Sequence, residues 1–207
     1  DSPRLDLKPN PLYEKTDLAF LKTHYYGGIR KYQWGTVPLS MHGVVMKADG
    51  ETVEVSIGEK EGDPQFCVTD LLPHLAAEQN GRKLGEGLKG EELNIIIGSI
   101  PYHDEENEKI KNPAKLLAMK LLNDRYGITE KDFTRAEIEM VPAYKAVDIG
   151  LDRGLIGSYG QDDRVCAYTA LMAEIAAKNP EHTTFTILTD KEEIGSDGVT
   201  GMQSMYV

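Results

Sequence analysis

The alternation of apolar and polar positions is clearest in the first half of the chain. Two β-forming runs, 42–48 and 52–57, flank the dipeptide Asp49-Gly50, and apolar side chains alternate with polar ones in the second run. Alternation of this kind is typical of a half-buried strand, and Asp-Gly is a dipeptide of type I′ turns. The pattern therefore predicts a β-hairpin.

Capping residues predict helices on either side of a further strand. Asp70 can cap a helix through about Asn80, with Pro73 tolerated in its first turn. A strand is expected at 93–98. A second helix is expected at 112–127, because Asn-Pro opens helices and glycine ends them.

The next segments repeat the order of helix and strand. Thr129 starts a short helical turn with Asp132 in a position like N3, and a strand follows at 136–141. Farther on, apolar residues recur at helical spacing: Tyr168, Leu171, Met172 and Ile175. They predict a helix that ends at Asn179-Pro180, followed by a strand at 184–188.

The two ends of the chain differ in texture from its middle. Residues 1–18 contain Pro3, Pro9 and Pro11, which keep a chain extended, and the start on Asp1 without a methionine suggests a segment of a longer protein. A helix followed by a strand near the C-terminus indicates an α/β unit, whereas the middle is typical of α+β structure. We therefore expect an α/β body formed by both ends and an inserted β-rich domain.

Composition narrows the class of protein. The 207 residues are 40% apolar and 28% charged, which is ordinary globular usage. No apolar run approaches the roughly 18 residues of a membrane span, and a formal net charge of −11 disfavours nucleic acid as a partner. Two cysteines indicate a reducing cytoplasm and exclude a four-cysteine zinc site.

Two pairs of neighbouring acids are candidate metal ligands. Asp162 and Asp163 precede the last predicted helix, and Glu192 and Glu193 follow the last predicted strand. Such pairs are most often solvated turns, but two metal ions about 3.5–4 Å apart also need oxygen ligands and a free base. Adjacent strand residues face opposite ways, so one glutamate could bind metal while the other handles a proton.

The histidines add no metal motif of their own. The chain has His24, His42, His74, His103 and His182, none of them in a His-Glu-x-x-His pattern. His42 alternates within a strand, which favours a structural role. His24 and His74 are left open by their spacing alone.

Five stretches carry a resemblance to a known family. DSPRLDLKPNPLYE, KTHYYGGIRKYQW, TDLLPHLA, IGSYGQDDRVCAYTAL and DKEEIGSDGVTGMQS together resemble the aspartyl aminopeptidase family, in its bacterial zinc aminopeptidase branch. The resemblance implies a cytoplasmic metalloexopeptidase with two zinc ions, bridged by an aspartate and a water or hydroxide. It also implies an α/β fold of the zinc-exopeptidase type.

The resemblance assigns roles to five residues. Asp163 would bridge the two zinc ions, Glu193 would bind one of them, and Glu192 would be the general base and acid. Asp1 would orient a histidine that stands two residues earlier in the family motif. His74 resembles the histidine that reaches from one subunit into its neighbour's active site; some relatives carry a second histidine one turn later, where this chain has Glu78.

The resemblance also divides the chain. Segments 1–19 and 148–207 would belong to the catalytic domain, and 20–147 would be an inserted dimerisation domain that builds a tetrahedral shell of twelve subunits. The upstream histidine, a further carboxylate and a further histidine of the family are not in this sequence. We expect weak metal binding and no turnover from these 207 residues alone.

The expected function is therefore a zinc aminopeptidase that hydrolyses N-terminal residues, possibly acidic ones, from peptides. The alternative is that the isolated chain is a non-catalytic oligomerisation module of that enzyme. A third hypothesis is a related dinuclear peptidase of different specificity.

Overall fold

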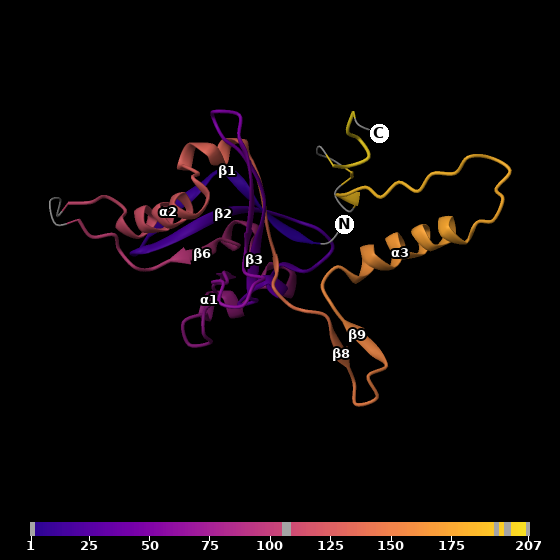
Figure 1. Ribbon diagram of the computed structural model, residues 1–207. Coiled ribbons are helices and arrows are strands. Elements are labelled where there is room, and N and C mark those ends of the chain that lie inside the picture. The colour runs from indigo at the N-terminus through magenta and orange to yellow at the C-terminus, as the bar shows by residue number, and fades with distance from the viewer. Residues whose placement is uncertain (1–2, 105–108, 193–194, 197–199, 206–207) are drawn as a thin grey trace. The chain divides into compact units, whose positions relative to one another are not determined.

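The computed structural model describes residues 3–104, 109–192, 195–196 and 200–205. The chain divides into two compact units (Figure 1). Arg4–Tyr25 with Ile29–Ala143 form what we call the sheet unit, and Asp1–Pro3, Tyr26–Gly28 and Tyr144–Val207 form what we call the helix unit.

A seven-stranded sheet dominates the sheet unit, with the strand order β4-β3-β7-β1-β2-β6-β5. The strands are β1 (Arg4–Lys15), β2 (Leu18–Tyr26), β3 (Leu39–Met46), β4 (Thr52–Ile57), β5 (Cys67–Val68), β6 (Ile95–Gly98) and β7 (Ala136–Pro142). The β3–β4, β3–β7, β1–β7, β2–β6 and β5–β6 pairs are all antiparallel. A sheet of this kind can bury one face and leave the other in water, which fits the alternation in the sequence.

The core of the sheet unit is fully buried and almost entirely apolar. Its largest completely buried side chains are those of Trp34, Leu5, Leu21, Leu39, Met41, Leu93, Ile95, Ile128, Met140, Val45 and Val68. They come from most of the strands and from the connecting segments, so long-range contacts hold the unit together. Burial at about 25 cal/mol per Å² makes this cluster the main source of the unit's stability.

The predicted hairpin is confirmed, but its turn is longer than predicted. Strands β3 and β4 pair from Met41–Ile57 to Met46–Thr52. The Lys47 N–H donates to the Glu51 carbonyl, and only Gly50 of the turn dipeptide has positive φ, at +90°. A type I′ turn needs positive φ at both central residues, so this is instead a three-residue loop with Gly50 in the left-handed position.

Strand β1 was predicted only as an extended segment. Pro9 and Pro11 argue against a central strand, because proline cannot donate to a ladder. In the structure β7 pairs with β1 only at Leu5 and Asp6, so neither proline lies in that ladder. Strand β1 therefore lies between β7 and β2, and neither proline takes part in its pairing with β7.

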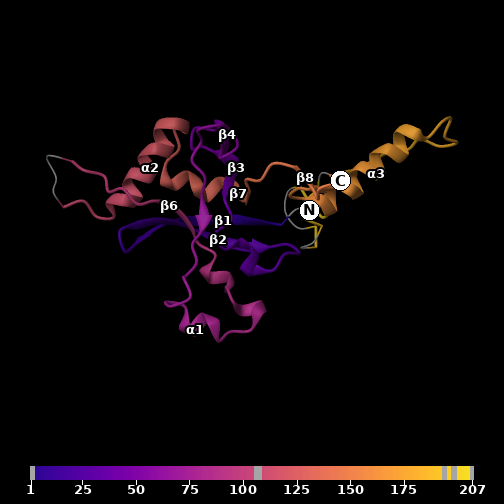
Figure 2. The ribbon, with the colours of Figure 1, turned by 90° about the horizontal axis from the view of Figure 1, so that it is seen from below.

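The second predicted helix and its neighbours are confirmed. Helix α2 (Pro113–Tyr126) ends at Gly127 with φ +67°, and its Gly127 N–H donates to Asn123. The 3₁₀ turn η4 (Glu130–Arg135) begins after Thr129, whose N–H donates to the Asp132 carboxylate at 2.8 Å. Figure 2 shows α2 on one side of strands β1 and β2 and the segment that carries α1 (Ala77–Asn80) on the other.

The first predicted helix is wrong over most of its length. Helix α1 spans only Ala77–Asn80, and Ala76 rather than Asp70 precedes it. The Asp70 carboxylate instead accepts hydrogen bonds from the Leu71 N–H and the Gln79 amide, both at 2.8 Å. Side-chain bonds of this local kind give the backbone an alternative to the helix. The shorter 3₁₀ turns of this unit are η1 (Lys31–Trp34), η2 (Leu84–Glu86) and η3 (Gly90–Glu92).

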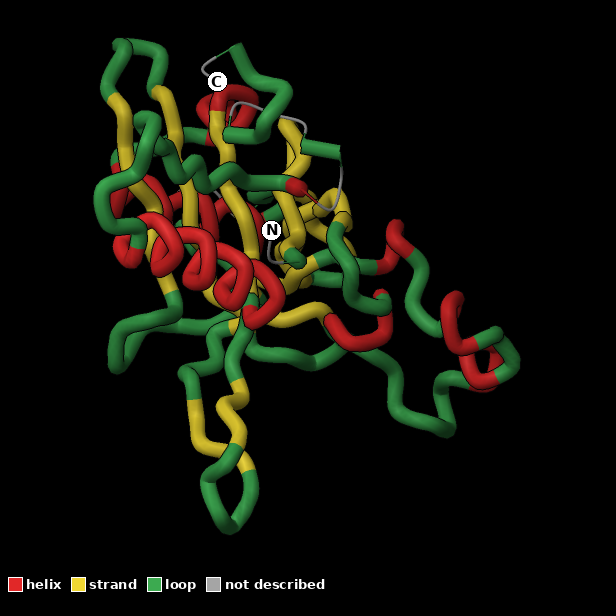
Figure 3. The backbone as a smooth tube through the Cα atoms, turned by 90° about the vertical axis from the view of Figure 1, so that its right-hand side faces the viewer, coloured by secondary structure: helices red, strands yellow, loops and turns green. Residues whose placement is uncertain are grey.

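The helix unit contains one hairpin and one helix among its described residues. Strands β8 (Val147–Ile149) and β9 (Leu155–Gly157) form a two-stranded sheet, seen as two short yellow strands in Figure 3. Helix α3 (Gln161–Ala176) confirms the predicted helix. The segment that follows α3 runs as a loop in Figure 1, so the strand predicted at 184–188 is wrong.

The missing strand has a simple physical cause. A strand needs a neighbour for its backbone N–H and C=O groups, and no described residue pairs with 184–188. The described chain is thus an antiparallel sheet with few helices, while the α/β character of the two ends stays a prediction. No helix in the part of the chain that the structure covers is long and apolar enough to cross a bilayer.

Candidate metal centre

Helix α3 places one predicted metal ligand in its first turn. Gly160 precedes the helix with φ +73°, a left-handed conformation that suits glycine. Asp162 and Asp163 follow, and Asp163 is half-buried whereas Asp162 is exposed. Acids in the first turn of a helix interact favourably with the helix dipole, which fits the placement of both aspartates.

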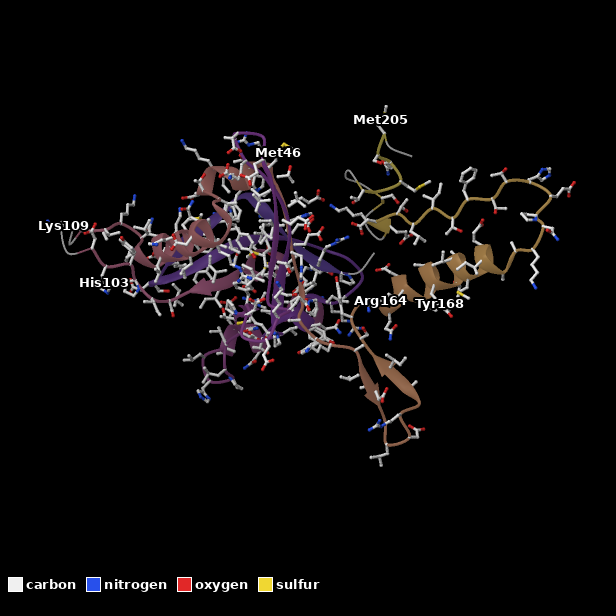
Figure 4. All side chains as sticks on the ribbon, in the orientation of Figure 1. Met46, His103, Lys109, Arg164, Tyr168 and Met205 are labelled. Carbon is white, nitrogen blue, oxygen red and sulfur yellow. The ribbon has the colours of Figure 1, made fainter. Side chains whose placement is uncertain are left out.

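Side chains on both sides of Gly160 fix the turn that leads into α3. The Gln161 amide donates to the Ile156 carbonyl at 2.9 Å, and the Arg164 guanidinium donates to the Ser158 hydroxyl at 3.3 Å. The Tyr159 hydroxyl donates to the Pro3 carbonyl at 2.8 Å. Figure 4 labels Arg164 and, one turn farther along α3, Tyr168.

The second carboxylate pair lies in a loop held by its own hydrogen bonds. Asp190 accepts a hydrogen bond from the Thr200 hydroxyl and donates its N–H to the Thr200 carbonyl. The Ser196 N–H donates to the Lys191 carbonyl at 2.7 Å, and Glu192 is exposed. The loop therefore fixes the backbone around Glu192 without burying its carboxylate.

The backbone here does not follow the rule used to separate the two glutamates. That rule assumed a strand, but Lys191 has φ +62° and no strand includes Glu192. Alternation of faces applies only to extended backbone, so the strand argument fails as a physical basis. The separate roles of Glu192 and Glu193 stay a prediction that rests on the family resemblance, and Glu193 lies outside the described residues.

His74 lies in the sheet unit, in the turn before α1. The Leu75 N–H donates to Leu72, the Ala76 N–H donates to Pro73, and the His74 side chain is exposed. Glu78, where some family members carry a histidine, pairs with Arg82 at 3.0 Å. His42, expected to be structural, has Nε2 3.1 Å from both the Ser40 hydroxyl and the Glu59 carboxylate.

The donor chemistry of the described residues suits zinc, but their number does not. Carboxylates are zinc ligands, and Asp163 and Glu192 both belong to the helix unit. Asp1 lies outside the described residues, as Glu193 does. Across the residues that the structure describes, no three His, Cys, Asp or Glu side chains are grouped to hold a metal ion.

The sheet unit contains a cavity of about 670 Å³. Its lining is mainly apolar and includes Ile57, Phe66, Ile97 and Leu121. Arg125 on its wall is 3.3 Å from the Asp63 carboxylate. None of the predicted site residues lines this cavity, so it adds nothing to the candidate metal centre.

Sequence reasoning missed two features of the helix unit. Lys191, beside Glu192, is only 6% exposed, which is rare for lysine, and no sequence pattern marks it. Gly27 has φ +102° and touches Pro3, which the Gly27-Gly28 dipeptide could have suggested. The close approach of Gly27 to Pro3 brings together segments that are far apart in the sequence.

Comparison with known proteins places these motifs in a family. The model of the family "Aminopeptidase I zinc metalloprotease (M18)" matches residues 1–207. The chain is 58% identical over 207 residues to a probable M18 family aminopeptidase 1 of Clostridium acetobutylicum, covering all of this chain and 44% of that relative. The chain thus spans less than half the length of the curated relative.

Solved structures agree with this assignment of the fold. The crystal structure of an M18 aminopeptidase from Thermotoga maritima matches with a TM-score of 0.89 and 53% identity, covering 100% of this chain and 44% of that chain. The S. cerevisiae mApe1 dodecamer matches with a TM-score of 0.61 and 18% identity, covering 97% and 44% of the two chains. The second likeness shows the fold alone.

Proposed function

Because the chain belongs to the M18 family of aminopeptidase I zinc metalloproteases, we propose that the whole protein is a zinc aminopeptidase that removes N-terminal residues from peptides. The observation that carries this proposal is the family match over all 207 residues, which include both carboxylate pairs. A preference for acidic N-terminal residues and a cytoplasmic location are further parts of the proposal.

In the proposed site Asp163 and Glu193 bind metal, and Glu192 moves the proton. Bound zinc would polarise the scissile carbonyl and lower the pKa of a water molecule. Glu192 would take a proton from that water and return it to the leaving amine. Its exposure supports this role, because a general base must reach a water molecule. Asp1 would orient a histidine ligand that lies outside these 207 residues. The further carboxylate and the further histidine of the family would also lie outside them.

We assign the two parts of the chain to different roles. Segments 1–19 and 148–207 would belong to an α/β catalytic domain, and 20–147 would be the inserted dimerisation domain. The dodecamer of S. cerevisiae mApe1 supports self-association, here proposed as dimers within a tetrahedral shell of twelve. His74, exposed in its turn, would reach into the active site of a neighbouring subunit.

A second candidate function applies to the 207-residue chain by itself. The sheet unit has its own buried core, whereas the described residues contain no group of three metal-binding side chains. These observations favour an oligomerisation module without peptidase activity. Light scattering and a zinc assay on this chain separate the two: a dimer without zinc or turnover supports the module.

The test of the catalytic roles uses the full-length protein. Glu192→Gln should retain zinc and lower kcat by roughly 10²–10⁴, the usual cost of removing a general base. Asp163→Ala should instead lose zinc, which metal analysis measures directly. Glu181→Gln, an exposed glutamate on the loop after α3, is the matched control and should keep full activity.

The base assignment fails if Glu192→Gln keeps activity within about tenfold of the wild type, since that loss is smaller than a base supplies. His74→Ala should keep its zinc and lose activity. In mixed oligomers, activity should return only where a neighbouring subunit supplies the histidine.

A further inference from the structure

Three segments that are far apart in the sequence meet within the helix unit. Pro3, Gly27 and Tyr159 belong to its three stretches of chain, and each of the other two residues contacts Pro3. Pro3 follows Asp1 by two residues, and Tyr159 precedes Asp163 by four. The contact thus joins the two segments that carry predicted site residues.

The first contact is a directed hydrogen bond. The Tyr159 hydroxyl donates to the Pro3 carbonyl at 2.8 Å, across a separation of 156 residues. Tyr159 is half-buried and lies next to Gly160, the left-handed residue that precedes α3. Because the proline ring holds φ near −65°, fixing the Pro3 carbonyl also limits how the chain enters Pro3.

The second contact depends on the absence of a side chain. Gly27 has φ +102°, and a Cβ added there would lie 2.7 Å from the Pro3 Cα and 2.9 Å from the Pro3 Cβ. Neither neighbour is the end of a flexible side chain, so any larger residue would have to push Pro3 away. Gly27 therefore lets the backbone of Pro3 approach closely.

We propose that Tyr159 and Gly27 are positioning residues, which together hold Pro3 against the turn that leads into α3. We call this arrangement the Pro3 clamp. It sets the N-terminal segment in register with the first turn of α3, where Asp163 lies. The inference rests on the proposed function, in which Asp1 orients a histidine ligand and Asp163 binds metal. The clamp would keep Asp1 aligned with Asp163.

The direct test is Tyr159→Phe in the full-length protein. This change removes only the hydroxyl, and Tyr144→Phe, at an exposed tyrosine of the helix unit, is the matched control. We expect Tyr159→Phe to release zinc to a chelator at about tenfold lower chelator concentration and to lower kcat by about tenfold, because lost supporting partners of metal ligands cost roughly 10–100-fold. KM and the unfolding temperature should stay close to the wild type.

The glycine supplies an independent arm. Gly27→Ala should lower zinc retention and kcat at least as much as Tyr159→Phe. Gly62→Ala is its control, because Gly62 has φ +85° with nothing within 4 Å of an added Cβ, so it shares the backbone strain without the contact. The double variant should be no worse than the stronger single variant, since both changes act on Pro3.

The outcomes separate the clamp from the function it serves. If Glu192→Gln abolishes activity while Tyr159→Phe keeps the zinc retention and kcat of the wild type, the clamp is overturned and the proposed function stands. A lower unfolding temperature with unchanged kcat would likewise overturn it, because a purely structural contact has that signature. A full-length wild type without zinc or turnover would overturn both proposals together.

Discussion

The sheet unit and the helix unit treat their apolar residues in opposite ways. In the sheet unit the large apolar residues converge, and Trp34, Leu5 and Leu21 have no exposed surface. Helix α3 has no buried residue at all. The apolar stripe of α3 is 40% to 65% exposed and consists of Val165, Tyr168, Leu171, Met172 and Ile175.

This difference indicates which unit is stabilised by its own packing. A helix with one apolar face is stabilised mainly by packing that face, and an isolated two-stranded hairpin is marginal in water. The helix unit has both features: an unpacked stripe on α3 and the β8–β9 hairpin, with Leu155 and Ile156 exposed. We therefore expect the sheet unit to be stable on its own and the helix unit to need more polypeptide.

The largest expected effect is a difference in local stability within the 207-residue chain. Amides of β3 and β7 should exchange with solvent only by global unfolding, with opening free energies of roughly 5 kcal/mol or more. Amides of α3 should open at roughly 0–2 kcal/mol, because no core holds the helix. Native-state hydrogen exchange measures both. Equal protection in the two units would show that α3 is packed, and the comparison would be wrong.

Local patterns in the sequence predicted much of the fold. The β3–β4 hairpin, α2, η4, β7 and α3 were all predicted, because alternation, helical spacing and caps act within a few residues. The failures lie where distant segments decide. Asp70 forms local side-chain bonds in place of a cap, and 184–188 has no described strand to pair with.

The candidate site was less accessible to sequence reasoning than the fold. The two pairs of neighbouring acids can be recognised directly in the sequence. No local sequence pattern predicts the positive φ of Lys191 or the contact of Tyr159 with Pro3. Only the family resemblance distinguished Glu192 from an ordinary exposed glutamate. Site geometry arises from the meeting of separate segments, which periodicity cannot reveal.

A matched pair of leucine variants compares the stability that one side chain contributes in each unit. Leu21→Ala in β2 should lower the free energy of unfolding by about 2–5 kcal/mol, the usual cost of a cavity in a core. Leu171→Ala in α3 is 45% exposed and should change it by less than about 0.5 kcal/mol in the same chain. The fluorescence of Trp34, the single tryptophan, and far-UV ellipticity follow unfolding in urea.

The same two leucine variants can be compared in the full-length protein. If the rest of the polypeptide covers the apolar stripe, Leu171→Ala should become destabilising there by about 2 kcal/mol or more. Leu21→Ala should cost about the same in both chains. A Leu171→Ala variant that is equally mild in both would mean that the stripe stays exposed.

The smallest expected effect concerns a polar contact in the sheet unit, the hydrogen bonds between Asp132 and Thr129 at the start of η4. The Asp132 carboxylate accepts hydrogen bonds from the Thr129 hydroxyl at 2.7 Å and the Thr129 N–H at 2.8 Å. These bonds, the hydroxyl first, hold the pKa of Asp132 below its ordinary value. Because the unfolded chain then binds protons more readily, this stabilisation is fully present above pH about 4 and is lost as pH falls through the folded pKa.

Asp132→Ala should therefore lower the free energy of unfolding by about 1 kcal/mol at pH 7, the usual cost of losing a cap. The difference from the wild type should shrink below pH about 4, where the wild-type carboxylate takes up its proton. Asp124→Ala, which breaks only the exposed pair with Lys120, should cost less than about 0.5 kcal/mol. Urea unfolding from pH 3 to pH 7, followed by Trp34 fluorescence, measures the three curves. If Asp132→Ala lowers the free energy of unfolding by the same amount across that range, the charge of Asp132 contributes nothing to stability. The start of η4 would then be stabilised by packing, as the core is.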